Sequence, residues 1–198
     1  MIKRDVDNFL LEIKNAIKVK ESILKSPEIL NSLYSLSEMC VLALSSGGKI
    51  IFAGNGGSFS DSQHLAAEFT SRFRVNRTSL ASVCLGTNSS TVTAIANDFG
   101  FEHIFSREFS SIARKSDVFI PISTSGNSKN ILRVTKMANN MSINTVALTG
   151  KSGGKLKSIC NCIAVPSEET ARIQECHILF GHILCGHIES KLFSKKKN

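Results

Sequence analysis

Residues 49–58, KIIFAGNGGS, contain the pattern from which the fold can be worked out. Lys49 to Ala53 form an apolar run with the length of a buried strand, and a helical pattern from about Ser58 to Phe73 follows. The glycine turn between them (residues 54–58) allows backbone angles closed to other residues and lets a ligand approach the main chain. A strand that leads through such a turn into a helix is the unit from which parallel sheets are built.

The same alternation of strand and helix continues along the rest of the chain. Alternation of this kind predicts a parallel sheet covered by helices on both faces. We therefore expect an α/β fold, a three-layer α/β/α sandwich on a five-stranded parallel sheet. The predicted strands cover residues 49–53, 80–85, 117–122, 145–148 and 162–165, and the predicted helices cover residues 58–73, 90–97, 102–114, 128–139 and 169–193.

Two amphipathic helices are predicted before the alternation begins, at residues 4–24 and 27–46. Their apolar faces need a partner, and we expect them to pack against a second copy of the chain. The sequence is thus interpreted as one domain, residues 1–198, in which 1–46 form a helical oligomerisation segment and 47–198 form the α/β core.

The composition is that of a globular protein, with 42% hydrophobic and 20% charged residues among 198. No stretch reaches the roughly 18 continuous apolar residues of a membrane span. The first residues, MIKRDVDNFL, lack the apolar core of a signal peptide. The six cysteines form no C-x-x-C pair and are expected to be free thiols. These features predict a cytoplasmic protein without a membrane partner.

The formal charge is +8, from 24 basic and 16 acidic residues, which favours anionic partners. Nucleic acid is disfavoured because Trp is absent and Tyr occurs once, so stacking surfaces are scarce. A phosphorylated small molecule is the other option. Part of the excess charge, Lys195 to Lys197, is typical of a solvated chain end.

A second turn, STSGNS at residues 123–128, also joins a predicted strand to a predicted helix. We call it the hydroxyl turn. Its four hydroxyls and the free amides of the helix start suit a phosphate monoester. Helix capping alone is the alternative, but one cap does not need four hydroxyls. Ligands in such folds bind at the carboxyl ends of the strands, where both turns lie.

Two predicted helices contain residues that fit a small metal site or an acid/base pair. His64 and Glu68 share a face because they are four residues apart, and Gln174 and His182 lie eight residues apart on one side of the last helix. Spacing alone does not bring the two helices together. A lone His/Glu pair is usually a surface contact.

Two further histidines lie five residues before and after His182, on other sides of the last helix. They are His177 and His187, and we expect them at the surface or in subunit contacts.

Five segments follow one another in a specific order: GNGGSFSDSQHLAAEF, AIANDFGFEHIFSRE, ISTSGNS, ALTGKSGGK and RIQECHILFGHIL. With them the chain resembles the bacterial phosphoheptose isomerases of the sugar isomerase (SIS) domain superfamily, from about residue 45 to 190. The resemblance implies the SIS fold, a homotetramer, and an enzyme that converts sedoheptulose 7-phosphate to D-glycero-D-manno-heptose 7-phosphate. The heptose would enter lipopolysaccharide or capsule.

The resemblance also implies roles for individual residues. Those matching positions that contact the sugar are Asn55, Gly56, Gly57, Glu68, Asn97, Asp98 and Gln174, and Arg72 matches an arginine that also serves the site. Those matching positions that hold the phosphate are Ser123, Thr124, Ser125 and Ser128. Those matching zinc ligands, with one ion per subunit, are His64, Glu68, Gln174 and His182.

The isomerisation moves a proton between C1 and C2 through an enediol. Glu68 is the candidate for the carbon-bound proton and His182 for the protons on the sugar oxygens. Zinc would either polarise the carbonyl or inhibit by occupying these two residues.

Two rival functions exist in the same superfamily. One is a non-enzymatic protein that binds the replication initiator DnaA, in which the acid/base positions are altered, whereas Glu68 and His182 are both present here. The other is a sugar-phosphate sensor attached to a DNA-binding module, and no helix-turn-helix pattern is visible in this chain.

Overall fold

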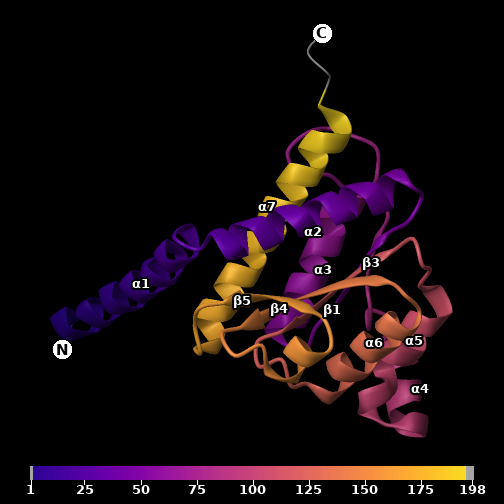
Figure 1. The fold of residues 1–198 in the computed structure, drawn as a ribbon. Coiled ribbons are helices and arrows are strands. Elements are labelled where there is room, and N and C mark those ends of the chain that lie inside the picture. Colours follow the sequence, from indigo (N-terminus) through magenta and orange to yellow (C-terminus); the bar gives the residue numbers. More distant parts are fainter. Residues whose placement is uncertain (1, 195–198) are drawn as a thin grey trace.

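The fold is seen in a computed structural model, which describes residues 2–194 and, from residue 5 on, their side chains (Figure 1). The expected basic tail, Lys195 to Lys197, lies outside the described residues. Within the described part, no helix combines the length and the apolar character needed to cross a membrane.

A single parallel sheet forms the centre of the molecule, in the order β2-β1-β3-β4-β5. All four strand pairs are parallel, as the alternation of strand and helix predicted. The strands are β1 (Ile50–Ala53), β2 (Ser82–Cys84), β3 (Val118–Ser123), β4 (Asn144–Gly150) and β5 (Asn161–Val165).

Helices cover both faces of this sheet, so the predicted three-layer sandwich is confirmed (Figure 1). Alternate residues of β1 point to opposite sides, as in any strand. Ile50 and Phe52 join one apolar cluster with α2, α3 and α7, and Ile51 and Ala53 join a second with α4, α5 and α6. The helices are α1 (Ile2–Leu24), α2 (Pro27–Ser45), α3 (Gly57–Thr70), α4 (Ser89–Phe99), α5 (Ile104–Ile112), α6 (Lys129–Asn140) and α7 (Thr170–Phe193), with short 3-10 turns at Phe101–His103 and Gly154–Ser158.

The strand order creates a crevice between β1 and β3. The chain leaves β1 for the edge strand β2 but leaves β3 for β4 on the other side, so the connections diverge between these two strands. Ligands bind at such a switch point, outside the carboxyl ends of the strands. Ala53 pairs with Pro121, so the glycine turn and the hydroxyl turn emerge side by side at this crevice.

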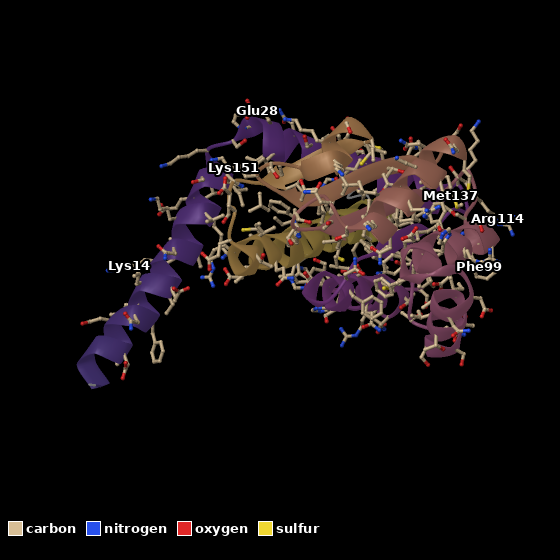
Figure 2. All side chains as sticks on the ribbon, turned by 90° about the horizontal axis from the view of Figure 1, so that it is seen from below. Lys14, Glu28, Phe99, Arg114, Met137 and Lys151 are labelled. Carbon is tan, nitrogen blue, oxygen red and sulfur yellow. The ribbon has the colours of Figure 1, made fainter. Side chains whose placement is uncertain are left out.

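The two N-terminal helices differ in what they contact. Helix α2 buries one side within the chain, where Leu33, Leu36 and Cys40 belong to the core cluster of the sheet, while Tyr34 and Leu42 stay exposed. Only α1 projects from the body (Figures 1 and 2). It leaves a row of large apolar side chains exposed, namely Val6, Phe9, Leu10, Leu11, Ile13 and Ile17.

Helix α3 ends at Thr70, three residues earlier than predicted, because a buried carboxylate binds the following backbone. Glu189 of α7 accepts hydrogen bonds from the amides of residues 73–75 and from Arg77 Nε. Arg77 in turn donates to the carbonyls of Glu68 and Phe69. Burial alone would raise the pKa of Glu189, but these hydrogen bonds lower it below its ordinary value. This pair fixes the end of α3 against α7.

The expectation of a position at the surface or in a subunit contact is wrong for His177, whereas His187 is partly exposed. His177 is fully buried, and its Nε2 lies 3.1 Å from the carbonyl oxygen of Thr149, to which it must donate. His187 is half-buried, and its Nε2 lies 2.8 Å from Glu38 Oε1 of α2. Both side chains therefore join α7 to other parts of the same chain.

The buried His177 makes stability depend on pH. Burial lowers its pKa from 6.5 to about 4, and its Nδ1 has no hydrogen-bond partner among the described residues. The unfolded chain therefore takes up a proton below about pH 6.5 that the folded chain refuses until about pH 4, so stability falls as pH falls through this window. We expect urea unfolding of the wild type to lose about 2 kcal/mol between pH 7 and pH 5 from this group.

The variant His177→Gln keeps a donor for Thr149 but cannot titrate, so its unfolding free energy should change less over the same range. His103→Gln, at a partly exposed histidine beside Glu102, is the matched control and should retain the wild-type pH dependence. Equal pH dependence in the wild type and His177→Gln would contradict this account.

Candidate active site

Close contact between α3 and α7 brings two distant parts of the chain together. Leu65 of α3 lies directly on Gly181 of α7, and a methyl group added at Gly181 would overlap the Leu65 side chain. At the start of α3, Gly57 lies against the side-chain amide of Gln174, where a methyl group would overlap as well. The two glycines thus leave room for the side chains of Leu65 and Gln174, so that the two helices pack closely.

Beside the Leu65–Gly181 contact, three of the predicted residues converge. They are His64, Glu68 and His182, whose potential ligand atoms all lie within 4.8 Å of one another. His64 Nε2 is 3.0 Å from Glu68 Oε1, and the ring centroids of the two histidines are 5.2 Å apart. The Phe73 ring also stacks on His182, with ring centroids 5.5 Å apart. The structure therefore shows the contact between α3 and α7 that residue spacing alone could not predict.

These three residues, which we call the His–Glu cluster, suit a transition metal ion. Two imidazole nitrogens and a carboxylate oxygen are ligands that zinc prefers, and three protein ligands leave the open position typical of catalytic zinc. The cluster is open to solvent in the single chain, since the His64 side chain is 49% exposed.

Gln174 does not join this cluster within the chain. It precedes His182 by eight residues, which is about 12 Å along a helix. Its amide instead contacts the glycine turn at Gly57.

Asp61 is a polar residue of this region that the sequence analysis did not single out. It lies one turn before His64 on α3, and its Oδ2 is buried without a hydrogen-bond partner among the described residues. Burial raises the pKa of Asp61 to about 6, and nearby His64 opposes that shift. Extending the His64–Glu68 spacing back by one turn would have found it.

The glycine turn follows β1 and opens α3. Gly54 lies so close to the backbone of Ser58 that no larger residue fits, and Gly56 has a positive φ of 54°. Asn55 between them is half-exposed, and its side-chain amide exchanges two hydrogen bonds, each 2.9 Å, with the side chain of Asn130.

The hydroxyl turn follows β3 and opens α6. Ser123 is 4% exposed, with its Oγ 3.3 Å from Ser128 Oγ, whereas Ser125 is exposed. Gly126 has a positive φ of 64° and packs against the backbone of Gly153. The ALTGKSGGK segment therefore supports the turn from behind.

A hollow of about 340 Å³ joins the two turns. It is lined by Asn55, Phe101, Glu102, Ser128, Lys129 and Asn130. The geometry thus places the Ser128 hydroxyl, the start of α6 and the Asn55 amide around one open space.

The remaining predicted residues lie apart from the His–Glu cluster. Asn97 and Asp98 are in the last turn of α4, on the other face of the sheet, and are exposed. Helix α4 continues to Phe99, two residues beyond its predicted end, and stops at Gly100, whose φ is 92°. Arg72 lies exposed just after α3, with no ion pair among the described residues.

Comparisons with known proteins agree with this arrangement. A model of the SIS domain family matches residues 14–150. The phosphoheptose isomerase of Aneurinibacillus thermoaerophilus is 46% identical over 185 residues, 93% of each chain. The solved structure of phosphoheptose isomerase GmhA from Neisseria gonorrhoeae is 38% identical, with a TM-score of 0.86 over 96% of this chain and all of that chain. That of a phosphoheptose isomerase from Francisella tularensis is 31% identical, with a TM-score of 0.88 over 94% and 98%. Over nearly its whole length, therefore, the chain belongs to the phosphoheptose isomerase family of SIS-domain proteins.

Proposed function

We propose that this chain interconverts sedoheptulose 7-phosphate and D-glycero-D-manno-heptose 7-phosphate, using Glu68 and His182 as its acid/base pair. The observation that supports these roles most directly is the convergence of His64, Glu68 and His182 from helices more than a hundred residues apart. A protein that only binds a partner or senses a ligand has no need of such a cluster.

The chemistry is a proton transfer between neighbouring carbons. The Glu68 carboxylate takes a proton from C1 of the ketose, and the electrons form a C1–C2 double bond as charge develops on O2. His182 gives a proton to O2 and accepts the proton of O1, so that C1 becomes the aldehyde. Glu68 returns its proton to C2. A positioned acid or base typically contributes about 10² to 10⁴ in rate.

Zinc is the metal that the His–Glu cluster suits, with His64, Glu68 and His182 as its ligands. A zinc ion held there would polarise the carbonyl as a Lewis acid. If the metal instead occupied both Glu68 and His182, it would inhibit the isomerisation, because neither residue could then transfer a proton. Gln174 lies about two helical turns from the cluster of its own chain. In this proposal it either binds the zinc ion of a second copy of the chain or contacts the sugar beside Gly57.

The hydroxyl turn is proposed to hold the phosphate through Ser123, Thr124, Ser125 and Ser128. Asn55, Gly56, Gly57, Asn97, Asp98 and Arg72 are proposed to contact the sugar.

The exposed apolar side of α1 supports self-association of the chain, which we propose to form a homotetramer. Phe9 is 66% exposed and Ile13 is 57% exposed, and a helix that projects from the body gains by burying such a face against another copy. Light scattering tests this proposal, and a mass of 21.5 kDa would mean a monomer. The free thiols fit the reducing cytoplasm, where we place the enzyme and its role in lipopolysaccharide or capsule heptose.

The direct experiment is to incubate the purified protein with sedoheptulose 7-phosphate and follow the aldose by NMR. Parallel samples contain a chelator, or a chelator followed by added zinc. Formation of the aldose supports the function, and its absence in every sample counts against it. A rate that falls with chelator and returns with zinc shows a catalytic metal, whereas a rate that rises shows an inhibitory one.

We predict that Glu68→Gln and His182→Gln each lower kcat by at least about 100-fold, because each removes a positioned acid or base. The KM should change much less, and circular dichroism should report folded protein. His187→Gln, on the same helix but paired with Glu38, is the matched control and should keep most of its turnover. Near-wild-type kcat in either of the first two variants would overturn the assignment.

The double variant Ser123→Ala/Ser125→Ala should raise KM by about tenfold or more, since hydrogen bonds to a charged group are lost. The affinity for inorganic phosphate, measured as a competitive inhibitor, should fall in parallel. Ser111→Ala, whose hydroxyl bonds only within α5, serves as the control. An unchanged KM in the double variant would exclude these serines from phosphate binding.

A further inference from the structure

The side chains of Asn55 and Asn130 differ in their exposure although they share two hydrogen bonds. Asn130, in the first turn of α6, is 3% exposed. Asn55, in the glycine turn, is half-exposed and lines the hollow together with Ser128. A nearly buried side chain therefore supports one that a ligand can reach.

The orientation of both amides is determined by the backbone of α6. The amide N–H of Ile131 lies 2.9 Å from Asn130 Oδ1, and a backbone N–H can only donate, so this atom must be the oxygen. Asn130 Oδ1 then also accepts from Asn55 Nδ2, and Asn130 Nδ2 donates to Asn55 Oδ1. Reversal of either amide would place like groups opposite one another.

Asn55 retains unused hydrogen-bonding capacity after these contacts. A primary amide has two N–H groups and an oxygen with two lone pairs, and Asn130 uses one of each. One N–H and one lone pair remain, and their directions are fixed by the pair. A hydroxyl-rich ligand in the hollow would meet a donor and an acceptor in set positions, without the cost of ordering the amide on binding.

We propose that Asn130 is a positioning residue for the isomerisation: it holds the Asn55 amide in the one orientation that binds the sugar hydroxyls. This inference rests on the proposed function, in which Asn55 contacts the sugar. Asn130 acts through Asn55 and does not touch the phosphate. A merely structural role would instead damage the hydroxyl turn that precedes α6.

The test is a double-mutant cycle of Asn55→Ala and Asn130→Ala, measured on sedoheptulose 7-phosphate. Asn130→Ala alone should lower kcat/KM by about tenfold or more, whereas in the Asn55→Ala background it should add less than about twofold. The affinity for inorganic phosphate should stay within about twofold of the wild type in all variants. Asn139→Ala is the matched control. Asn139 lies at the far end of α6, and its side-chain amide donates a hydrogen bond to the carbonyl of Ile159.

The proposal would be overturned by additive losses of kcat/KM in the cycle, or by a loss of phosphate affinity equal to the loss of kcat/KM. In either case, turnover by the wild type would still support the enzyme function. A wild type without turnover would instead refute the function. Hydrogen exchange of the Asn55 side-chain amide, followed by NMR on protein labelled at asparagine, then decides the inference. We expect faster exchange in Asn130→Ala, and an unchanged rate would contradict it.

Discussion

The packing of Leu65 on Gly181 is the contact on which the proposed site depends. Because Gly181 has no side chain, α3 and α7 approach closely enough for His64 and Glu68 to meet His182. Burial of Leu65 in the core makes this contact part of the fold rather than a surface encounter. The ion pair of Arg77 with Glu189 holds the same two helices farther along, and both of these side chains are almost fully buried.

The sheet supplies the other half of the site. Its strand order separates the connections of β1 and β3, so the glycine turn and the hydroxyl turn adjoin one hollow. Helix α3 then runs from the glycine turn, where the sugar is proposed to bind, to the His–Glu cluster, so that one rigid element holds the proposed sugar contacts and the proposed base. Such rigidity is what proton transfer between neighbouring carbons requires, since misplacement of a base is costly in rate.

Much of this arrangement could be predicted from the sequence, because strands alternate with helices at clear intervals and the two turns have distinct compositions. The pairing of Glu68 with His182 could not, since helical spacing defines a face but not its neighbour. The burial of His177 was missed for the same reason: its acceptor, the Thr149 carbonyl, is a backbone group of a strand. Asp61 and Asn130 look like ordinary polar residues until their surroundings are known. The use of α2 within the chain was missed because an apolar helix face does not identify what covers it.

The most direct measurement is the turnover of Gly181→Ala, since a methyl group there would push α3 from α7. Gly186→Ala is the control, because its added methyl would meet only side-chain ends, those of Arg74 at 3.3 Å and of Phe73 at 3.6 Å, rather than overlapping a packed side chain. The account predicts that Gly181→Ala lowers kcat by at least about tenfold. Adding Leu65→Ala to the same chain should make room for the methyl group and restore part of the lost kcat. Gly186→Ala should keep a kcat near that of the wild type. A folded Gly181→Ala protein with wild-type kcat would show that the closeness of these helices does not set the chemistry.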